Sequence, residues 1–221
     1  MPTPSSKEWK RARKPAQKAA RKEEILAAAK RLFSMGSYDQ VSLNSIAREA
    51  GMSKPNVYRY YASREEIFLH ILGEEQDRYI DALFRELQSA DRSHPVDEVA
   101  RIWVEQALKL PDLLRLLPQL GSSLEQNSSV EQLTLFKKRS FERAAELALA
   151  HHSLYPELNP DQWGEVINTA VALMAGMWPL CNGNEIVEQA MKHPSVGLAP
   201  WDFEQKMTFA LKAVILGAAL F

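Results

Sequence analysis

Apolar residues recur three and four positions apart along most of the chain, which is the spacing of amphipathic helices. Ile25, Ala28, Leu32 and Phe33 are an early example. Later segments of roughly 13 to 20 residues keep this spacing between Pro, Gly and Asn breakers. No segment alternates as a β-strand would. The pattern predicts an all-α protein with about nine helices.

Three helices are predicted before the long one that begins at Ser63. The first ends at Gly36, where a left-handed C-terminal cap is expected, and Ser42 can cap the second, which Gly51 ends. Ser53 can cap a third helix over Lys54–Tyr60, with a proline in its first turn, where a missing amide donor costs little. Two short helices joined by a turn at Gly51 form a helix-turn-helix.

A long helix is predicted from Ser63 to about Leu87. Ser63 and Glu66 form a capping box, in which the hydroxyl accepts from the Glu66 amide while the Glu66 carboxylate reaches back. Residues 1–20 hold three prolines and lack hydrophobic periodicity, so we expect a flexible basic arm there. The expected domains are this arm, a helix-turn-helix domain over residues 21–66 and a helical domain over residues 67–221.

Composition restricts the class of protein. The single cysteine, Cys181, excludes a disulfide framework and a cysteine-based zinc cluster within one chain. Residues 1–22 carry basic side chains without an apolar run, so no secretory signal is expected. No apolar stretch reaches the ~20 residues of a membrane span. We therefore expect a cytoplasmic protein with no membrane partner.

The formal net charge of −1 conceals an asymmetry along the chain. Residues 1–70 hold 14 basic and 7 acidic residues, a net +7, whereas the remainder carries −8. A basic segment on an acidic body suggests that one end meets a polyanion. A merely solubilising tail is the alternative that charge alone leaves open.

The segment from Val41 to Phe68 reads VSLNSIAREAGMSKPNVYRYYASREEIF. With Phe33 before it, the motifs are Ile46-Ala47…Ala50-Gly51-Met52-Ser53, Val57-Tyr58…Tyr60-Tyr61 and Arg64-Glu65-Glu66-Ile67. In these motifs the chain resembles the TetR family of bacterial transcription regulators over about Glu23 to Leu72, and beyond that in layout only. The resemblance implies a three-helix DNA-binding domain followed by a helical ligand-binding and dimerisation domain.

The third helix divides its residues by face. Val57 and Tyr61, four positions apart, are the expected inward anchors, which leaves other positions facing out. Arg59 can fork onto guanine, and Asn56 can pair with adenine or a phosphate. From chemistry and family position, the expected DNA contacts are Ser42, Asn44, Ser45, Lys54, Pro55, Asn56, Tyr58, Arg59, Tyr60 and Arg64. An ordinary solvated face with capping serines is the alternative.

Three positions depart from the family pattern. Many members have histidine where this chain has Tyr60, and lysines where it has Ala62 and Arg64. We therefore expect a set of contacts to the DNA backbone that is thinner or differently shaped, and the basic arm from Lys7 to Lys22 can compensate along or in the adjacent minor groove. An arm that stays unbound is the alternative.

No catalytic constellation is visible in the C-terminal region. Asp161, Glu165 and Glu185 have neither a nucleophile nor a glycine-rich phosphate loop beside them. His151 and His152 are adjacent, about 100° apart on a helix, so they make a poor metal pair and are expected to be exposed polar residues. We expect neither an enzyme nor a bound metal or cofactor.

Aromatic and sulfur-containing side chains are frequent between residues 100 and 180, and helical spacing makes them core residues by default. The resemblance implies a ligand pocket between the helices that follow the fourth, and an apolar, aromatic-lined cavity suits a small hydrophobic molecule. The candidate ligand contacts are Trp103, Leu117, Phe141, Met174 and Trp178.

Two segments are too apolar for lone surface helices. Residues 166–181 contain no charged residue and residues 208–221 contain only Lys212, so both need covering on nearly every side. The resemblance implies a two-fold four-helix bundle with a second copy. The expected interface residues are Ala172, Gly176, Phe209, Leu216 and Leu220. Burial inside a larger monomer core is the alternative.

These expectations favour a ligand-responsive repressor whose homodimer binds a palindromic double-stranded DNA operator and releases it when a small effector binds. A DNA-bound scaffold that recruits a protein partner without an effector is the second hypothesis. A helical enzyme with an unrecognised site is the third.

Overall fold

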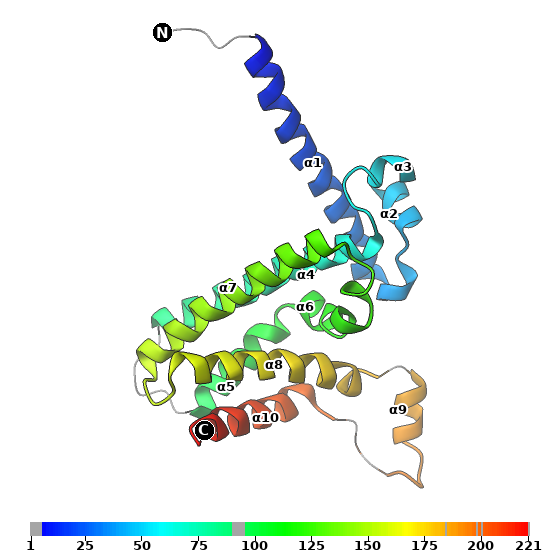
Figure 1. The fold of residues 1–221 in the computed structure, drawn as a ribbon. Coiled ribbons are helices and arrows are strands. Elements are labelled where there is room, and N and C mark those ends of the chain that lie inside the picture. Colours follow the sequence, from blue (N-terminus) through cyan, green and yellow to red (C-terminus); the bar gives the residue numbers. More distant parts are fainter. Residues whose placement is uncertain (1–5, 90–95, 184, 198, 200, 221) are drawn as a thin grey trace. The chain divides into compact units, whose positions relative to one another are not determined.

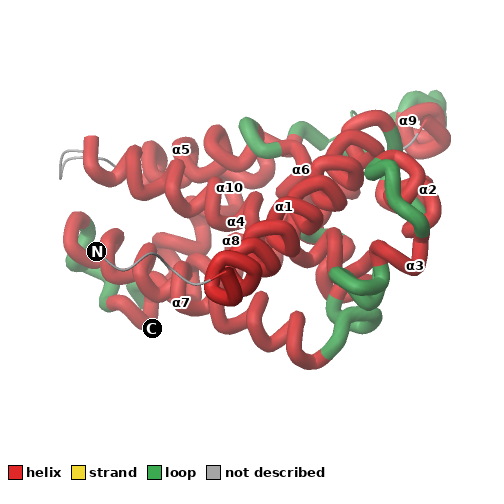
Figure 2. The backbone as a smooth tube through the Cα atoms, turned by 90° about the horizontal axis from the view of Figure 1, so that it is seen from above, coloured by secondary structure: helices red, strands yellow, loops and turns green. Residues whose placement is uncertain are grey.

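The computed structural model describes residues 6–89, 96–183, 185–197, 199 and 201–220, with side chains from residue 16 onward except at Ser89. Within these residues the chain forms ten α-helices, a 3-10 turn and a π-helical turn, and no strand (Figures 1 and 2). The all-α prediction is confirmed. The chain divides into two units, which we call the head (Met1–Ile71 with Ser123–Leu133) and the body (Leu72–Ser122 with Thr134–Phe221).

The head holds the three predicted helices and the start of a fourth. Its elements are α1 (Ser6–Met35), the 3-10 turn η1 (Tyr38–Gln40), α2 (Leu43–Glu49), α3 (Lys54–Val57) and the first turns of α4 (Arg64–Ser89). Phe68 of α4 is central to the core, because the rings of Phe33 and Tyr38 pack against it edge to face, with centroids 5.4 and 5.0 Å away. Aromatic pairs of this geometry add to the stabilisation that burial provides.

The start of α1 differs from the expected flexible arm over residues 1–20. The helix begins at Ser6 and continues unbroken to Met35. The physical reason is composition, since residues 16–22 are alanine, glutamine, lysine and arginine, all of high helix propensity. Residues 1–5 of the expected arm, and the side chains of residues 6–15, lie outside the described part of the chain.

The two turn glycines of the head have different roles. Gly51 adopts the left-handed conformation that was predicted, with φ of 64°. Gly36 does not have a positive φ, so the left-handed cap predicted there is wrong. A Cβ at Gly36 would lie 2.7 Å from the side-chain oxygen of Gln40, which accepts a hydrogen bond from the Ser37 amide. Gly36 therefore leaves space for the Gln40 side chain.

The body consists of longer helices. After α4 come α5 (Val96–Leu108), α6 (Pro111–Leu116), the π-helical turn η2 (Leu120–Leu124), α7 (Val130–Leu154), α8 (Pro160–Cys181), α9 (Glu185–Met191) and α10 (Phe203–Ala218). Helices α8 and α10 lie side by side, and α10 also contacts α5 (Figure 1). The largest side chains that are completely covered in the body include Trp163, Leu113 and Leu114.

The division between the units differs slightly from the expected boundary. It falls after Ile71, within α4, and not after residue 66. The head also includes Ser123–Leu133, a segment that the sequence places far downstream. None of the helices among the described residues is long and apolar enough to cross a membrane.

Candidate nucleic-acid interface and ligand cavity

The start of α2 is fixed by two serines. The Ser42 hydroxyl accepts from the Ser45 amide at 3.1 Å, and the Ser45 hydroxyl accepts from the Ser42 amide at 2.9 Å. This reciprocal cap satisfies amide groups that the first turn of a helix leaves unpaired. Asn44 lies between them and is exposed. The two serines therefore orient α2, and the predicted contact residues Ser42 and Asn44 are both exposed in this turn.

Helix α3 is anchored by Val57 and presents the rest of its residues to solvent. Val57 and the following Tyr61 are buried, as their spacing predicted. The helix proper ends at Val57, and i to i+3 hydrogen bonds carry the turn on through Tyr60. Ser53 occupies the N-cap position but makes no side-chain capping bond, which corrects the prediction made for it.

The exposed residues of α3 and the turn after it form one polar surface. Its members are Lys54, Pro55, Asn56, Tyr58 and Arg59. Tyr58 is 50% exposed, and the Lys54 ammonium lies 5.8 Å from the centroid of its ring. Arg59 has no hydrogen-bond or ion-pair partner among the described residues. A guanidinium that no neighbour uses keeps its donor fork for a ligand. Tyr60, by contrast, is half-buried.

Arg64, a predicted DNA contact, makes several hydrogen bonds within the head. Its Nη1 donates to the carbonyl oxygens of Tyr38 and Val41, at 3.3 and 2.9 Å. Its Nε donates to the Glu65 carboxylate at 3.1 Å, and the guanidinium lies 4.3 Å from the centre of the Tyr38 ring. Arg64 therefore holds the backbone between η1 and α2, which places Ser42 at the start of α2.

The head contains a buried carboxylate, that of Glu66, whose partners the sequence predicted only in part. Ser63 caps α4 as predicted, with its hydroxyl accepting from the Glu66 amide at 3.1 Å. The Glu66 carboxylate, however, accepts from the Ala62 amide at 2.7 Å and from Ser129. Burial alone would raise the pKa of Glu66, but the hydrogen bonds from Ser129 and Ala62 outweigh burial and lower it. Only the Ser63 half of this arrangement has a local sequence signal.

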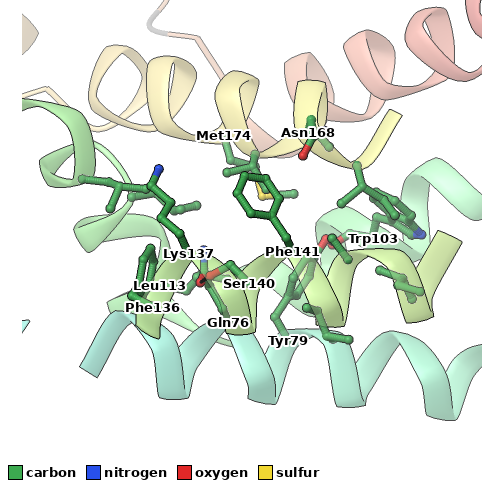
Figure 3. Close-up of a pocket in the computed structure, with 18 residues that line it drawn as sticks. Gln76, Tyr79, Trp103, Leu113, Phe136, Lys137, Ser140, Phe141, Asn168 and Met174 are labelled. Atoms are coloured by element: carbon green, nitrogen blue, oxygen red, sulfur yellow. Dashed lines mark hydrogen bonds between the residues drawn. The ribbon is translucent and has the colours of Figure 1, made fainter. Parts of the chain in front are cut away.

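The body contains a cavity between its helices. Its volume is about 190 Å³, and its walls come from α4, α5, α6, α7, α8 and the turn η2. Four of the five predicted ligand residues line it, namely Trp103, Leu117, Phe141 and Met174. Figure 3 shows Phe141 of α7 reaching towards Met174 of α8. Phe141 is 61% exposed, so it lies at the open side of the cavity.

Trp178 is not among the residues that line the cavity. Its ring packs edge to face against Phe203 of α10, with centroids 5.0 Å apart. Met174 and Trp178 lie on nearly the same face of α8, one turn apart along its axis, so Met174 meets the cavity and Trp178 meets Phe203 of α10. The sequence indicated an apolar aromatic face but could not separate these two neighbours.

Few polar groups face the cavity. Ser140 of α7 donates a hydrogen bond to the side-chain oxygen of Gln76 of α4 at 2.9 Å. Asn168 and Lys137 also line the wall (Figure 3). The Tyr79 hydroxyl is occupied, since it donates to the Trp103 carbonyl at 3.0 Å. The sequence analysis did not identify Gln76 and Ser140, because single polar residues on amphipathic helices carry no distinguishing signal.

His151 is a core residue, so its predicted exposure is wrong. It is 0% exposed, its Nε2 accepts from the Trp103 indole at 3.1 Å, and its Nδ1 donates to the Leu147 carbonyl at 2.9 Å. This arrangement needs the neutral ring, because Nε2 must accept. Burial lowers the pKa of His151 from 6.5 to about 4, against a smaller opposing effect of the Leu147 hydrogen bond.

The predicted interface residues lie on the outer faces of α8 and α10. Ala172 and Gly176 of α8 are exposed, as are Phe209 (73%) and Leu216 of α10 and Leu220 (82%), which follows that helix. The opposite faces are buried, with Ile167 and Met174 on α8. Each helix therefore uses one apolar face within its own chain and leaves a second one open.

Two family models match the chain. The model described as "Bacterial regulatory proteins, tetR family" matches residues 25–71. The model described as "Tetracyclin repressor-like, C-terminal domain" matches residues 73–220, which is more than half of the chain. The junction between the two matches lies within α4, close to the division between head and body.

Curated relatives match over shorter stretches. The HTH-type transcriptional regulator HbdR of Aromatoleum sp. (strain CIB) is 30% identical over 84 residues, which are 38% of this chain and 36% of that protein. The HTH-type transcriptional regulator EthR of Mycolicibacterium smegmatis is 32% identical over 74 residues, which are 33% of this chain and 34% of that protein. The chain thus spans about a third of the length of each of these relatives.

Solved structures share the fold along most of the chain. A putative TetR-family transcriptional regulator from Syntrophomonas wolfei aligns with a TM-score of 0.57 at 14% identity, over 92% of this chain and 96% of that one. A TetR-family transcriptional regulator from Streptomyces coelicolor aligns with a TM-score of 0.52 at 15% identity, over 91% and 83%. At such identities the likeness concerns the fold.

Proposed function

The chain belongs to the TetR family of bacterial regulatory proteins, and from this membership we propose that it is a transcription regulator. Its homodimer binds a palindromic double-stranded DNA operator through the two heads. A small, mainly apolar molecule binds in the body cavity and lowers the affinity for the operator. In this proposal the regulator is a repressor that leaves its operator when the ligand binds.

The observation that carries the DNA-binding proposal is the exposed surface of α3. Asn56 and Arg59 present an amide and a guanidinium, the groups that pair with the major-groove edges of adenine and guanine. Lys54 and Tyr58 add a charge and a hydroxyl for phosphate oxygens. Arg64 acts as a positioning residue, because its donors hold the backbone before α2.

The effector proposal rests on the size and lining of the body cavity. A cavity of about 150 Å³ lined by apolar side chains accommodates benzene, and the one here measures about 190 Å³. We therefore expect a ligand with one ring, or a short branched chain, and a small substituent. The Gln76 and Ser140 side chains offer a hydrogen-bonding pair that would orient a polar group on it.

The dimer proposal rests on the open apolar faces of α8 and α10. Gly176 and Ala172 are small residues four positions apart, which allow another helix to approach closely. Phe209, Leu216 and Leu220 supply apolar surface to bury against a second copy. An isologous contact of this kind would give the pair two-fold symmetry and the operator a palindromic sequence.

Selection from random double-stranded DNA tests the central proposal. We expect the purified protein to enrich a palindromic motif whose half-sites lie about one helical turn, or a multiple of it, apart. Footprinting on the enriched sequence should protect both half-sites. Enrichment of no motif above background would contradict DNA-binding regulation by this chain.

A thermal-shift screen against small metabolites tests the effector. A ligand at about 100 times its Kd stabilises the native state by about 2.7 kcal/mol and raises the melting temperature. The ligand found must also weaken operator binding, since a ligand acts only through its different affinities for the two states. A regulator that binds its operator but no small molecule would favour the scaffold that recruits a protein partner.

A further inference from the structure

The N-terminal part of α1 extends beyond the packed core of the head. The buried face of α1 starts at Ile25, whereas every side chain from Ala16 to Arg21 is exposed. Figure 1 shows this part of the helix continuing past α2 and α3. A helical segment without a covered face gains little stability from packing. Its exposed residues are therefore available to a partner.

A groove separates this part of α1 from the end of α3. Its volume is about 800 Å³. The side chains that matter to its chemistry are Lys18, Ala20, Arg21 and Glu24 of α1, and Arg59 and Tyr60 in the turn after α3. On α1, Lys18 and Arg21 are three positions apart, as are Arg21 and Glu24, and Ala20 is four positions before Glu24, so these residues lie on one side of the helix. That face of α1 lies opposite Arg59 and Tyr60, which follow α3.

The chemistry of the groove suits an anionic chain. Lys18, Arg21 and Arg59 are three cations, and Glu24 is the acid among the lining residues. Glu24 pairs with Arg21 at 2.5 Å, and both side chains are about half exposed. An ion pair this exposed contributes little stability and can exchange for a phosphate. Ala20 is small, which lets a backbone come close to α1.

We propose that this groove binds the phosphodiester backbone of the operator beside the major groove that α3 enters. The inference rests on the proposed DNA-binding function. Arg59 belongs both to the exposed surface of α3 and to the groove, so a duplex on α3 brings its backbone to the mouth of the groove. Contacts of this kind add affinity and orientation without reading sequence.

Replacing Lys18 and Arg21 together by glutamine tests the proposal. Glutamine keeps helix propensity and removes both charges. Each phosphate contact contributes about 0.9 to the slope of log K against log salt, and the dimer loses two such contacts at each half-site. The slope should therefore become shallower by roughly three to four. Binding to operator and to random duplex should weaken by the same factor, on the order of tenfold or more at physiological salt. Hydroxyl-radical footprinting should show lost protection of sugars flanking each half-site.

A matched control removes the same charge from the body. Lys109 and Lys138 are exposed and lie outside both the groove and the cavity. The K109Q/K138Q protein should keep the wild-type salt slope. A K18Q/R21Q slope equal to that of this control, with circular dichroism of a folded protein, would overturn the proposal.

The Glu24→Gln variant gives a second test of opposite sign. Removing the carboxylate frees Arg21 for phosphate, so affinity should rise severalfold and the salt slope should steepen. Unchanged or weakened binding by E24Q would count against the groove. The wild-type protein is the reference in both tests. If it enriches no DNA sequence, the proposed function fails. If it binds its operator and the variants leave the salt slope unchanged, only the groove proposal fails.

Discussion

The Glu66 carboxylate accepts hydrogen bonds from both the amide and the hydroxyl of Ser129, at 3.1 and 2.6 Å, across 63 positions of sequence. Glu66 stands in the first turn of α4, and Ser129 directly precedes α7. Both belong to the head. This bond pair explains why a segment from the middle of the chain packs with the N-terminal helices, since Ser129 provides two donors for a carboxylate that is 5% exposed.

Glu66→Gln should destabilise the head. The neutral amide keeps one acceptor oxygen and turns its NH₂ group towards donors, so at least one charge-assisted bond is lost. We expect a loss of about 1–3 kcal/mol in the free energy of unfolding, measured by urea denaturation. Glu23→Gln is the control, because Glu23 is exposed on α1. Equal stabilities of the two variants would contradict the role given to Glu66.

Because burial lowers the pKa of His151, we expect the protein to lose stability as the pH falls. Its pKa is about 4 in the folded chain, against the ordinary histidine value of 6.5 that applies once the chain unfolds, so between these values the unfolded chain binds more protons. Stability therefore rises with pH across this window and falls on acidification. The expected loss is about 2 kcal/mol between pH 7 and pH 5, measured by urea denaturation.

The control for this pH dependence is His151→Gln. Glutamine does not titrate, and it can still accept from Trp103 and donate to the Leu147 carbonyl. Its free energy of unfolding should vary less between the two pH values than that of the wild type, whatever its absolute stability. An equally steep dependence in H151Q would assign the effect to another group.

Local signals in the sequence predicted much of the head. The Ser42 cap, the left-handed Gly51 and the Val57 and Tyr61 anchors each depend on residues within a few positions, and all are present. Gly36 shows the limit of such signals, because a glycine after a helix has two physical explanations. A left-handed φ is one, and the space taken by Gln40 is the other, which needs the folded turn to be recognised.

Long-range contacts account for what the sequence could not predict. The burial of His151 depends on Trp103, 48 positions away, and no local pattern distinguishes it from the less buried His152. The family position of Arg64 predicts a DNA contact and gives no sign of the hydrogen bonds that this residue makes within the head. Its donors are used by carbonyl groups 23 and 26 residues earlier in the chain, which only the tertiary structure reveals.

Arg59→Ala should weaken operator binding and relax specificity. A bidentate contact to a base is worth about 1–3 kcal/mol, and its loss should broaden the selected motif at one position in each half-site. Lys54→Ala should instead weaken all duplexes by a similar factor, because a phosphate contact carries no sequence information. Gel-shift titration on operator and scrambled duplexes measures both effects. A uniform loss with R59A would remove Arg59 from base recognition.

Ala144→Phe should fill the body cavity. Ala144 lines the cavity from α7, whereas its neighbour Ala145 is exposed and does not. A phenyl group at position 144 takes up space that a small ligand needs, so the thermal shift caused by the effector should disappear while DNA binding without effector remains. Ala145→Phe is the matched control and should respond like the wild type. A full response in A144F would place the effector site elsewhere.

Gly176→Asp should dissociate the dimer without unfolding the protomer. A Cβ at Gly176 meets no atom within 4 Å in its own chain, so the aspartate fits there, and any penalty must come from a second copy. A carboxylate buried in an apolar helix interface without a partner is strongly unfavourable. Analytical ultracentrifugation should then show the 25.0 kDa monomer.

Gly164→Asp, in the same helix and equally unobstructed, is the control and should remain dimeric. Leu216→Asp on α10 should act like G176D, because Leu216 is exposed on the other proposed contact helix. Both variants should lose operator binding together with dimerisation, since one head then holds one half-site alone. A G176D protein that stays dimeric and binds its operator would place the interface on another face.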